Sequence, residues 1–365
     1  MEWIAGPSPG NDQETTMASK TSIRAAVLGA SGYTGADMVR LAARHPNVEI
    51  TALIAKGHAG QPLAQVFPHL ASLDLPALVT SDQVDWSKID VVFGGLPHGT
   101  AHSEIAKLPE SVKVVDMSAD FRLRDPKTYA EWYGGEHSAP DLIKDAVYGL
   151  TEHYRDKIKG ARIIACPGCY PTAVLLALLP LLKAKLIAAE DIIIDAKSGV
   201  SGAGRTLKQN ILFSEAGEGL SPYGIANHRH VPEIEQELGL AAGSPVAVNF
   251  TPHLVPMSRG ELCTTYVRLA GKANAADLRK VLTSAYETSP FVRIVEEGTT
   301  PATQHVRGSN YCHVGVFADR LKGRAIVVSA IDNLVKGSAG QALQNFNLMY
   351  GFDETLGLEQ LPLFP

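Results

Sequence analysis

The segment from residue 23 to residue 46 constrains the fold of this chain more than any other. It begins with a short apolar run, Ile23 to Leu28, passes through glycines at positions 29, 32 and 35, and continues as an amphipathic pattern that stops near His45-Pro46. A second apolar run, VEITALIA, follows directly. Strand, glycine turn, helix and strand within about thirty residues predict a βαβ unit, and therefore a parallel sheet.

The same alternation recurs along the first half of the chain. A strand at Val91 to Phe93 precedes a loop and a helix, and VKVVDMSADFRL indicates a further strand and loop. After Cys169 the pattern changes to strand-like runs such as DIIIDAKS, PVAVNFTPHLVP, ELCTTYVRLA and AIVVSAIDN, with few helices. We therefore expect an α/β fold with a Rossmann-type doubly wound parallel sheet, plus an α+β second domain with a mainly antiparallel sheet.

The length of the chain also predicts more than one domain, because 365 residues exceed what one ordinary hydrophobic core holds. We expect a disordered leader at 1–22, which is too acidic for a transit peptide and lacks the apolar centre of a secretory signal. A dinucleotide-binding domain is predicted at 23–168 and a catalytic and oligomerisation domain at 169–332. A C-terminal helix and tail at 333–365 are expected to return to the dinucleotide-binding domain.

Charge and apolar content exclude several classes of partner. A net charge of −5 gives no electrostatic reason to expect nucleic acid or an anionic membrane surface. The longest apolar run, Ala173 to Leu182, contains Pro180 and is far shorter than the roughly 20 residues of a membrane span. Four cysteines in so long a chain are not a disulfide framework, which favours a reducing compartment.

The glycine turn indicates a bound dinucleotide. Its spacing is G-x-x-G-x-x-G rather than the usual G-x-G-x-x-G, but glycines at a helix N-terminus still let backbone N–H groups approach a pyrophosphate. An NAD enzyme would place an acidic residue at the end of the second strand, whereas this strand ends in Lys56, which suits the 2′-phosphate of NADP. A tight strand–helix connection and a solvated lysine are the alternatives that these residues leave open.

Cys166 and Cys169 lie three positions apart, before an apolar run. Pro171 predicts that a helix begins at Cys169, and the helix dipole would then lower the pKa of its thiol. Three hypotheses compete: a thioredoxin-like dithiol, a zinc site that adds His228 and His230, and a single nucleophile, Cys169. A dithiol domain would be short and lack a dinucleotide-binding half, and the roughly sixty-residue gap to an H-x-H pair fits no compact zinc site. The residues favour the single nucleophile.

Histidines supply candidates for proton transfer. The loop NHRHVPEIEQEL, from Asn227, holds two histidines beside arginine and glutamate, and Pro232 opens the helix that follows. Histidine suits general acid–base catalysis because its ordinary pKa is near neutrality. His98 follows a strand at its carboxyl end, where open α/β sheets bind ligands, so we expect it near the cofactor or as a loop cap.

Eight motifs occur in an order that resembles one known family. They are GASGYTGADMVRLAARHP, LPHGTAH, DMSADFRL, PGCYPTA, DAKSGVSGAGR, HRHVPEIEQEL, FTPHLVPMSRG and RGSNYC. They span nearly the whole chain after residue 22. Together they resemble the N-acetyl-γ-glutamyl-phosphate reductases, NADPH-dependent enzymes of arginine biosynthesis that are related to aspartate-semialdehyde dehydrogenase. The segments VFPHL and LPLFP are most similar to plant plastid members.

The resemblance implies roles for the residues at matching positions. Cys169 matches the nucleophile, and His228 is similar to the general acid–base residue. The substrate-binding positions implied are Arg122, which would bind phosphate, Ser201, Arg205, and, for substrate or for orientation, His230 and Glu233. The positions expected at the cofactor, from the glycine turn and the resemblance together, are Gly29, Ser31, Gly32, Tyr33, Thr34, Gly35, Lys56, Pro97, His98, Ser198, Gly199 and Asn333. No metal is implied.

The implied chemistry proceeds through a thioester. The Cys169 thiolate attacks an acyl phosphate, phosphate leaves with help from Arg122, and the thioester accepts hydride from NADPH. The tetrahedral oxyanion then expels a thiolate, which protonated His228 protonates. Most relatives have asparagine where this chain has Cys166. If that asparagine binds the oxyanion, a backbone N–H must carry more of the task here.

Other readings remain at this point. One is an acyl-phosphate reductase similar to aspartate-semialdehyde dehydrogenase, and another is a zinc- or disulfide-based C-x-x-C binding module. A third is a catalytically silent scaffold with this fold. The expected partner is a small-molecule acyl phosphate, without nucleic acid or membrane. The resemblance further implies a homo-oligomer, a tetramer, located in the chloroplast stroma of a plant or in the cytoplasm otherwise.

Overall fold

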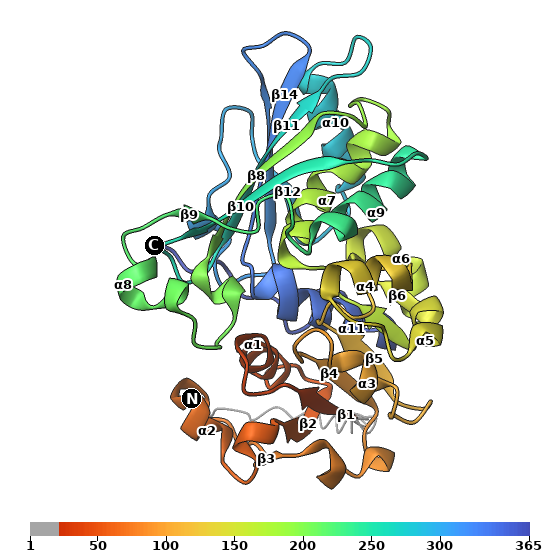
Figure 1. The fold of residues 1–365 in the computed structure, drawn as a ribbon, viewed down its shortest axis with the longest axis vertical. Helices are drawn as coiled ribbons and strands as arrows, with labels where there is room; N and C mark the ends of the chain where they lie inside the picture. The colour runs from red at the N-terminus through yellow and green to blue at the C-terminus, as the bar shows by residue number, and fades with distance from the viewer. Residues whose placement is uncertain (1–21) are drawn as a thin grey trace, which may run out of the picture.

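The computed structural model describes residues 22–365, so nearly all of the expected leader lies outside the described residues. Within that range the chain forms two seven-stranded sheets. Figure 1 shows the first sheet at the lower end of the molecule and the second at the upper end. The predicted fold class, a Rossmann-type parallel sheet followed by a sheet-rich second domain, is confirmed.

The first sheet has the strand order β3-β2-β1-β4-β5-β7-β6, and each of its described pairings is parallel. Its central strands are buried on both faces, because helices and loops cover a parallel sheet on both sides. The strands are β1 (Ile23–Leu28), β2 (Val48–Ile54), β3 (Leu78–Val79), β4 (Val91–Gly94), β5 (Lys113–Asp116), β6 (Ala146–Tyr148) and β7 (Ile163–Ala165). The helices of this half are α1 (Tyr33–Ala42), α2 (Leu63–Val66), α3 (Ala101–Ile105), α4 (Pro126–Tyr133), α5 (Pro140–Asp145) and α6 (Thr151–Lys159).

The second sheet is mixed, in the order β12-β13-β14-β11-β8-β10-β9. In the described part, β10 with β8 and β12 with β13 are parallel pairs, and the other four pairings are antiparallel. The strands are β8 (Ile192–Gly199), β9 (Ser221–Pro222), β10 (Val248–Val255), β11 (Glu261–Arg268), β12 (Val292–Ile294), β13 (Cys312–Ala318) and β14 (Arg324–Ile331). The prediction of a mainly antiparallel sheet is confirmed for its central strands, because β13, β14, β11 and β8 pair antiparallel in succession.

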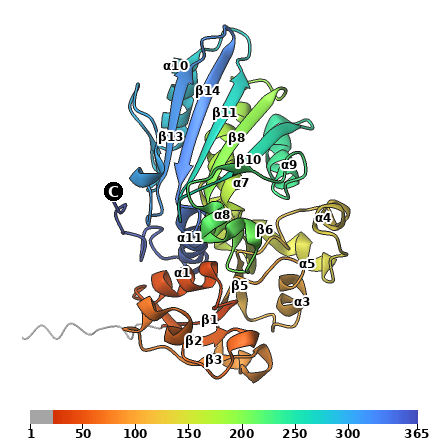
Figure 2. The same ribbon diagram turned by 60° about the vertical axis from the view of Figure 1, so that its left-hand side comes forward.

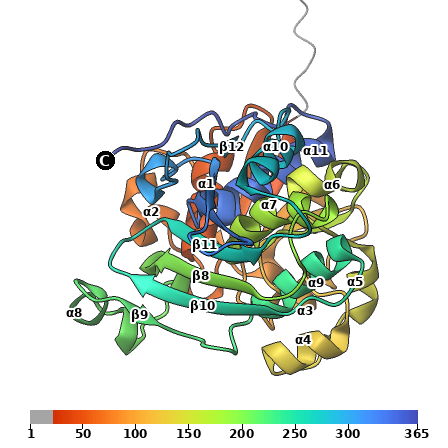
Figure 3. The ribbon, with the colours of Figure 1, turned by 90° about the horizontal axis from the view of Figure 1, so that it is seen from above.

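Three helices cover one face of the second sheet: α7 (Cys169–Lys183), α9 (Val231–Ala242) and α10 (Ala275–Ala285). Figures 2 and 3 show them together on that side, and Figure 3 shows the short α8 (Phe213–Ala216) beside β9, the edge strand of the sheet. The apolar run noted in the sequence is buried in α7, between the sheet and its neighbouring helices. Among the described helices, none combines the length and the apolar content that crossing a membrane requires.

The end of the chain packs against the first domain. After β14, a π-helical turn (Val335–Ala339) leads into α11 (Gly340–Tyr350), whose residues belong to the core around β1 and β4. The rings of Phe346 and Phe93 lie 5.5 Å apart between centroids. The last described strand and the last helix therefore belong to different domains.

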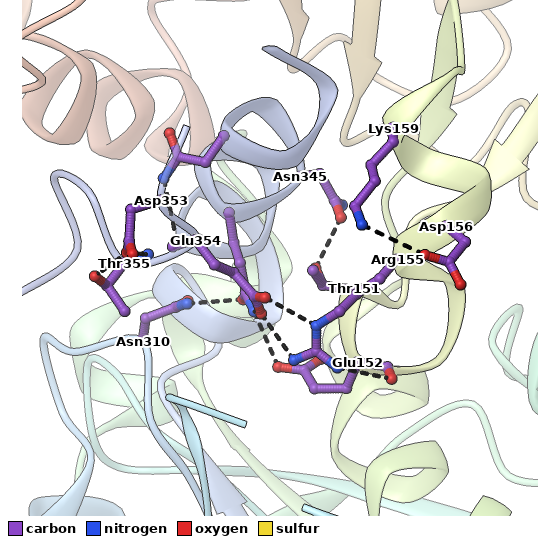
Figure 4. Close-up of polar contacts among 12 residues, drawn as sticks. Thr151, Glu152, Arg155, Asp156, Lys159, Asn310, Asn345, Asp353, Glu354 and Thr355 are labelled. Atoms are coloured by element: carbon purple, nitrogen blue, oxygen red, sulfur yellow. Dashed lines mark hydrogen bonds and ion pairs between the residues drawn. The ribbon is translucent and has the colours of Figure 1, made fainter. Parts of the chain in front are cut away.

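Polar contacts fix this C-terminal segment to α6 (Figure 4). Arg155 donates to Glu354 through Nε at 2.8 Å, and the Thr151 hydroxyl donates to Asn345 Oδ1 at 2.7 Å. Deeper in the same region, the Lys336 ammonium lies 2.6 Å from a carboxylate oxygen of Glu152, and both side chains are fully buried. A buried pair of this kind loses stability sharply when only one partner is removed.

Candidate active site

A cavity of about 540 Å³ lies between the two domains, at the carboxyl ends of β4 and β5 and the first turn of α7. This is the edge of a parallel sheet at which open α/β folds bind ligands. The structure brings a group of the predicted site residues together around it. Those that line the cavity are Pro97, His98, Arg122, Cys169, Ser198, His228 and His230.

Cys169 is the first residue of α7, and Gly168 is its N-cap, as the sequence predicts. The expected lowering of the Cys169 pKa is wrong for this structure. Burial raises the pKa of the Cys169 thiol well above its ordinary value, and the carboxyl of Glu261 adds to the increase. The physical reason is that the free-energy cost of removing the thiolate from water exceeds the stabilisation that the helix dipole gives it.

Glu233 holds the residue in front of the nucleophile. Its Oε1 accepts the backbone N–H of Gly168 at 2.9 Å and the hydroxyl of Tyr148 at 2.8 Å, while Oε2 lies 3.4 Å from Nη1 of Arg122. Glu233 is buried and is not among the residues that line the cavity. Of the two roles expected for it, substrate binding and orientation, its contacts support orientation.

Arg122 is placed by main-chain oxygens. Its Nε donates to the carbonyl of Cys166 at 2.7 Å and its Nη2 to the carbonyl of Met117 at 2.8 Å. Its Nη1 points toward the start of α7, where a Cβ added to Gly168 would lie 2.9 Å from it. The same added Cβ would lie 2.5 Å from His230 Nε2. A cation and an imidazole therefore meet at the glycine beside the nucleophile.

The two loop histidines pack together, with ring centroids 4.8 Å apart, and the His230 backbone N–H donates to His228 Nδ1 at 3.1 Å. Burial, helped by Arg229, lowers the pKa of His228 to about 4, and burial lowers the pKa of His230 well below its ordinary value. The expectation that protonated His228 reprotonates the sulfur therefore does not fit this structure, because both rings are neutral near pH 7.

Cys166 lies in a different environment from Cys169. It is fully buried in the core of the first domain, where Asn345 Nδ2 lies 3.6 Å from its sulfur, and Cys169 packs against the core of the second. All four cysteines are free thiols. Within residues 22–365 there is no group of three or more His, Cys, Asp or Glu side chains with the geometry to hold a metal ion.

A second cavity, of about 600 Å³, adjoins the first at Leu96, which lines both. It follows the glycine turn, and Gly29, Ser31 and Lys56 line it. Gly29 has a φ of +78°, and a Cβ there would lie 2.4 Å from the Gly95 carbonyl oxygen. Because Gly32 caps α1 without a side-chain hydrogen bond, the first N–H groups of that helix remain available to an anion. Lys56 lies at the end of β2, as expected.

Most of the remaining predicted residues lie near the contact between the two domains, outside the two cavities described above. Asn333 accepts the backbone N–H of Gly260 at 2.8 Å and donates to the Ser201 hydroxyl at 2.9 Å, which joins three loops. Ser201 lines a third cavity beside α1, together with Tyr33. Arg205 stacks on Phe67 at 4.6 Å and is not among the residues that line the Cys169 cavity. Those without a place in the lining of these three cavities are Gly32, Thr34, Gly35, Gly199, Arg205, Glu233 and Asn333.

Sequence reasoning missed Glu261, whose carboxyl lies beside the Cys169 thiol. A signal was present, because Glu261, Cys263, Thr265 and Val267 alternate onto the buried face of β11 and only the first of them is acidic. An acidic residue at a core position of a strand favours a functional role over a structural one.

Comparisons with known proteins agree with this geometry. Residues 24–161 match the family model for the semialdehyde dehydrogenase NAD binding domain, and residues 169–333 match that for the semialdehyde dehydrogenase dimerisation domain. The chain is 54% identical to the probable N-acetyl-gamma-glutamyl-phosphate reductase, chloroplastic, of Arabidopsis thaliana, over 99% of this chain and 91% of that protein. It is 56% identical to the N-acetyl-gamma-glutamyl-phosphate reductase of Rhodospirillum rubrum, over 94% of this chain and 99% of that one.

Solved structures show the same fold at lower identity. Aspartate semialdehyde dehydrogenase II of Vibrio cholerae, complexed with ASA, has a TM-score of 0.69 and 18% identity, over 90% of this chain and 98% of that chain. Aspartate semialdehyde dehydrogenase of Candida albicans, solved with NADP, has a TM-score of 0.66 and 19% identity, over 90% and 98% of the two chains.

Proposed function

This chain belongs to the family of N-acetyl-γ-glutamyl-phosphate reductases, and we propose that it reduces N-acetyl-γ-glutamyl phosphate to N-acetylglutamate 5-semialdehyde in arginine biosynthesis. One observation carries the proposal. Cys169 opens a helix at the wall of a cavity that also holds Arg122 and two imidazoles, and this cavity adjoins the glycine-turn cavity at Leu96. The chain is an NADP-dependent oxidoreductase of the semialdehyde dehydrogenase family.

The residues of the glycine-turn cavity fit NADP. Backbone N–H groups at the start of α1 suit the pyrophosphate, and Lys56 with Thr80 and Ser81 suits a 2′-phosphate at the end of β2. Bound NADPH supplies the hydride. Because Leu96 lines both cavities, a dinucleotide that extends from Lys56 past this residue reaches the pocket of Cys169.

The side chains around the sulfur divide the remaining work. Cys169 attacks the acyl carbon and forms a thioester, which accepts hydride more readily than a carboxylate does. Arg122 stabilises the phosphate that leaves, and its two main-chain contacts hold it in place before substrate arrives. His228 is the acid–base residue on the oxygen side of the reaction. It enters the reaction neutral, since its pKa is about 4 in the ligand-free protein, and an anionic substrate raises that pKa.

The assembly and the compartment belong to the same proposal. A dimerisation domain covers residues 169–333, and we expect it to join protomers into a tetramer. The plant relatives of Arabidopsis and rice are named chloroplastic, so we place the protein in the chloroplast stroma if its source is a plant, and in the cytoplasm otherwise.

The test is run in the reverse direction. Purified protein is given NADP⁺, inorganic phosphate and N-acetylglutamate semialdehyde, and NADPH formation is followed by absorbance. Reduction that requires phosphate is expected, with aspartate semialdehyde, which lacks the N-acetyl group and is one methylene shorter, at least a hundredfold slower. A faster rate with aspartate semialdehyde would assign the enzyme to the other substrate class. No NADPH from either would refute the proposal.

A further inference from the structure

Glu261 is the first residue of β11 and is fully buried in the second domain. Its carboxyl lies beside the Cys169 thiol. In the described part of the chain, neither of its oxygens has a hydrogen-bond partner. A buried carboxyl without hydrogen-bond donors destabilises the folded state, because it has lost its hydrogen bonds to water and has formed none with the protein.

The backbone fixes Glu261 at this position. In the sheet it is paired with Ser198 of β8 and Ile331 of β14. A Cβ added to Gly337 would lie 2.7 Å from the Cβ of Cys169 and 3.2 Å from Cδ1 of Ile331, so the first turn of α7 lies against the end of β14. The carboxyl and the sulfur are therefore brought together by three separate segments of the fold.

Other buried carboxylates nearby are satisfied by donors, and Glu261 is not. Glu233 accepts from Gly168, Tyr148 and Arg122. Glu237 forms a salt bridge with Arg124 at 3.2 Å. A carboxyl retained without such partners next to a nucleophile indicates a chemical role.

The pKa of this carboxyl supports the same conclusion. Burial raises the pKa of Glu261 to about 8, although the Cys169 thiol acts in the opposite direction. A group with a pKa near the working pH accepts and returns a proton with little energetic loss.

We propose that Glu261 exchanges a proton with the sulfur of Cys169 in each half of the reaction, which makes it a catalytic residue. The inference rests on the proposed function. As the S–C bond forms, the thiol proton passes to the Glu261 carboxylate, and the C–O bond to phosphate breaks. The departing phosphate takes a proton from solvent. After hydride reduction of the thioester, the C–S bond breaks and Glu261 returns its proton to the thiolate. One proton is consumed overall.

Several other charged or ionisable groups interact electrostatically with Glu261 and Cys169, and none of them is changed in the variants used for the test. Asp332 raises the pKa of Glu261, and Arg122 lowers that of Cys169. Tyr170, Tyr223 and Cys263 face the same pair.

The decisive variant is Glu261→Gln, assayed in two ways. Turnover is expected to fall by about 100-fold or more, the loss typical of a removed acid–base group. Alkylation of Cys169 by iodoacetamide in the ligand-free protein at pH 8, measured by peptide mass spectrometry, is expected to become several-fold faster. The reason is that the carboxyl that raises the thiol pKa is gone. Turnover within threefold of the parent, or a parallel fall of turnover and alkylation, would overturn the proposal.

Two further variants keep the test sharp. Thr265→Val changes another buried position on the same face of β11 and is expected to leave turnover and Cys169 alkylation unchanged. Glu261→Asp keeps the ionisable group and is expected to turn over faster than Glu261→Gln, and equal turnover of the two would contradict proton exchange by this carboxyl. If the unaltered protein forms no NADPH in the reverse assay, the proposed function is wrong. If the unaltered protein is active but the Glu261 variants do not behave as expected, only the role of Glu261 is refuted.

Discussion

The carboxylate of Glu233 accepts the backbone N–H of Gly168 at 2.9 Å, so a residue of α9 holds the N-cap of the helix that begins with the nucleophile. The same carboxylate lies 3.4 Å from Arg122. One side chain thus fixes the position of the sulfur and balances the charge of the cation expected to bind phosphate.

Glu233→Gln is expected to impair both folding and catalysis. Arg122 would keep its buried charge without a counter-charge, a change that costs about 3 kcal/mol in similar buried pairs. Urea denaturation measures this loss. Turnover should fall roughly 10- to 100-fold, in line with a lost charge-assisted hydrogen bond of about 1.5–3 kcal/mol. Unaltered stability would show that Arg122 is neutralised by another group.

The two cysteines of the C-x-x-C pair should respond differently to substitution. Cys169→Ser is expected to abolish turnover, because a serine hydroxyl at this half-buried position is a far poorer nucleophile than a thiol. Cys166→Ala is expected to keep most turnover and to lose about 1 kcal/mol of stability from the small cavity that it creates. Initial rates and thermal melts of both variants check this. The reverse pattern would assign the nucleophile to Cys166.

Alkylation of Cys169 in the ligand-free protein should depend steeply on pH. Because burial and Glu261 raise the pKa of this thiol well above its ordinary value, the thiol is protonated throughout the range from pH 7 to pH 9. Below its pKa the thiolate fraction rises about tenfold for each pH unit. The iodoacetamide rate should follow it without a plateau. A plateau reached by pH 7 would show instead that the helix dipole dominates.

Lys56 should determine the preference between the two nicotinamide dinucleotides. Lys56→Ala is expected to raise KM for NADPH about tenfold, the effect of one lost hydrogen bond to a charged group, and to leave kcat unchanged. KM for NADH should hardly move. Steady-state kinetics with both cofactors measures the difference. Lys88→Ala, an exposed lysine that does not line the cavity, is the control.

Much of the fold follows from local sequence patterns. The apolar run of β1 and the glycines after it predict the first βαβ unit, and a Cβ added at Gly29 or Gly35 would lie 2.4 or 2.3 Å from a carbonyl oxygen. Gly168 and Pro171 predict the start of α7 in the same way, because both signals lie within a few residues of the helix end that they mark.

What the sequence does not reveal depends on contacts between distant segments. The raised pKa of Cys169 comes from packing against β11 and the π-helical turn, which lie about 90 and 170 residues further along the chain. Arg205 follows a glycine-rich loop expected at the substrate, yet its side chain stacks on Phe67 of the first domain. Periodicity identifies the buried face of β11, but it does not say that a sulfur lies opposite Glu261.

The π-helical turn has a mechanical consequence. The chain passes from the first domain to the second between Cys166 and Cys169, and it returns between Asp332 and Gly337, which lies against Cys169. Both covalent links between the domains therefore run past the nucleophile. If the domains rotate as rigid bodies, the hinge axis passes near the sulfur. The residues at the outer edge of the Cys169 cavity would then move over a bound ligand, while the Cys169 sulfur would hardly move.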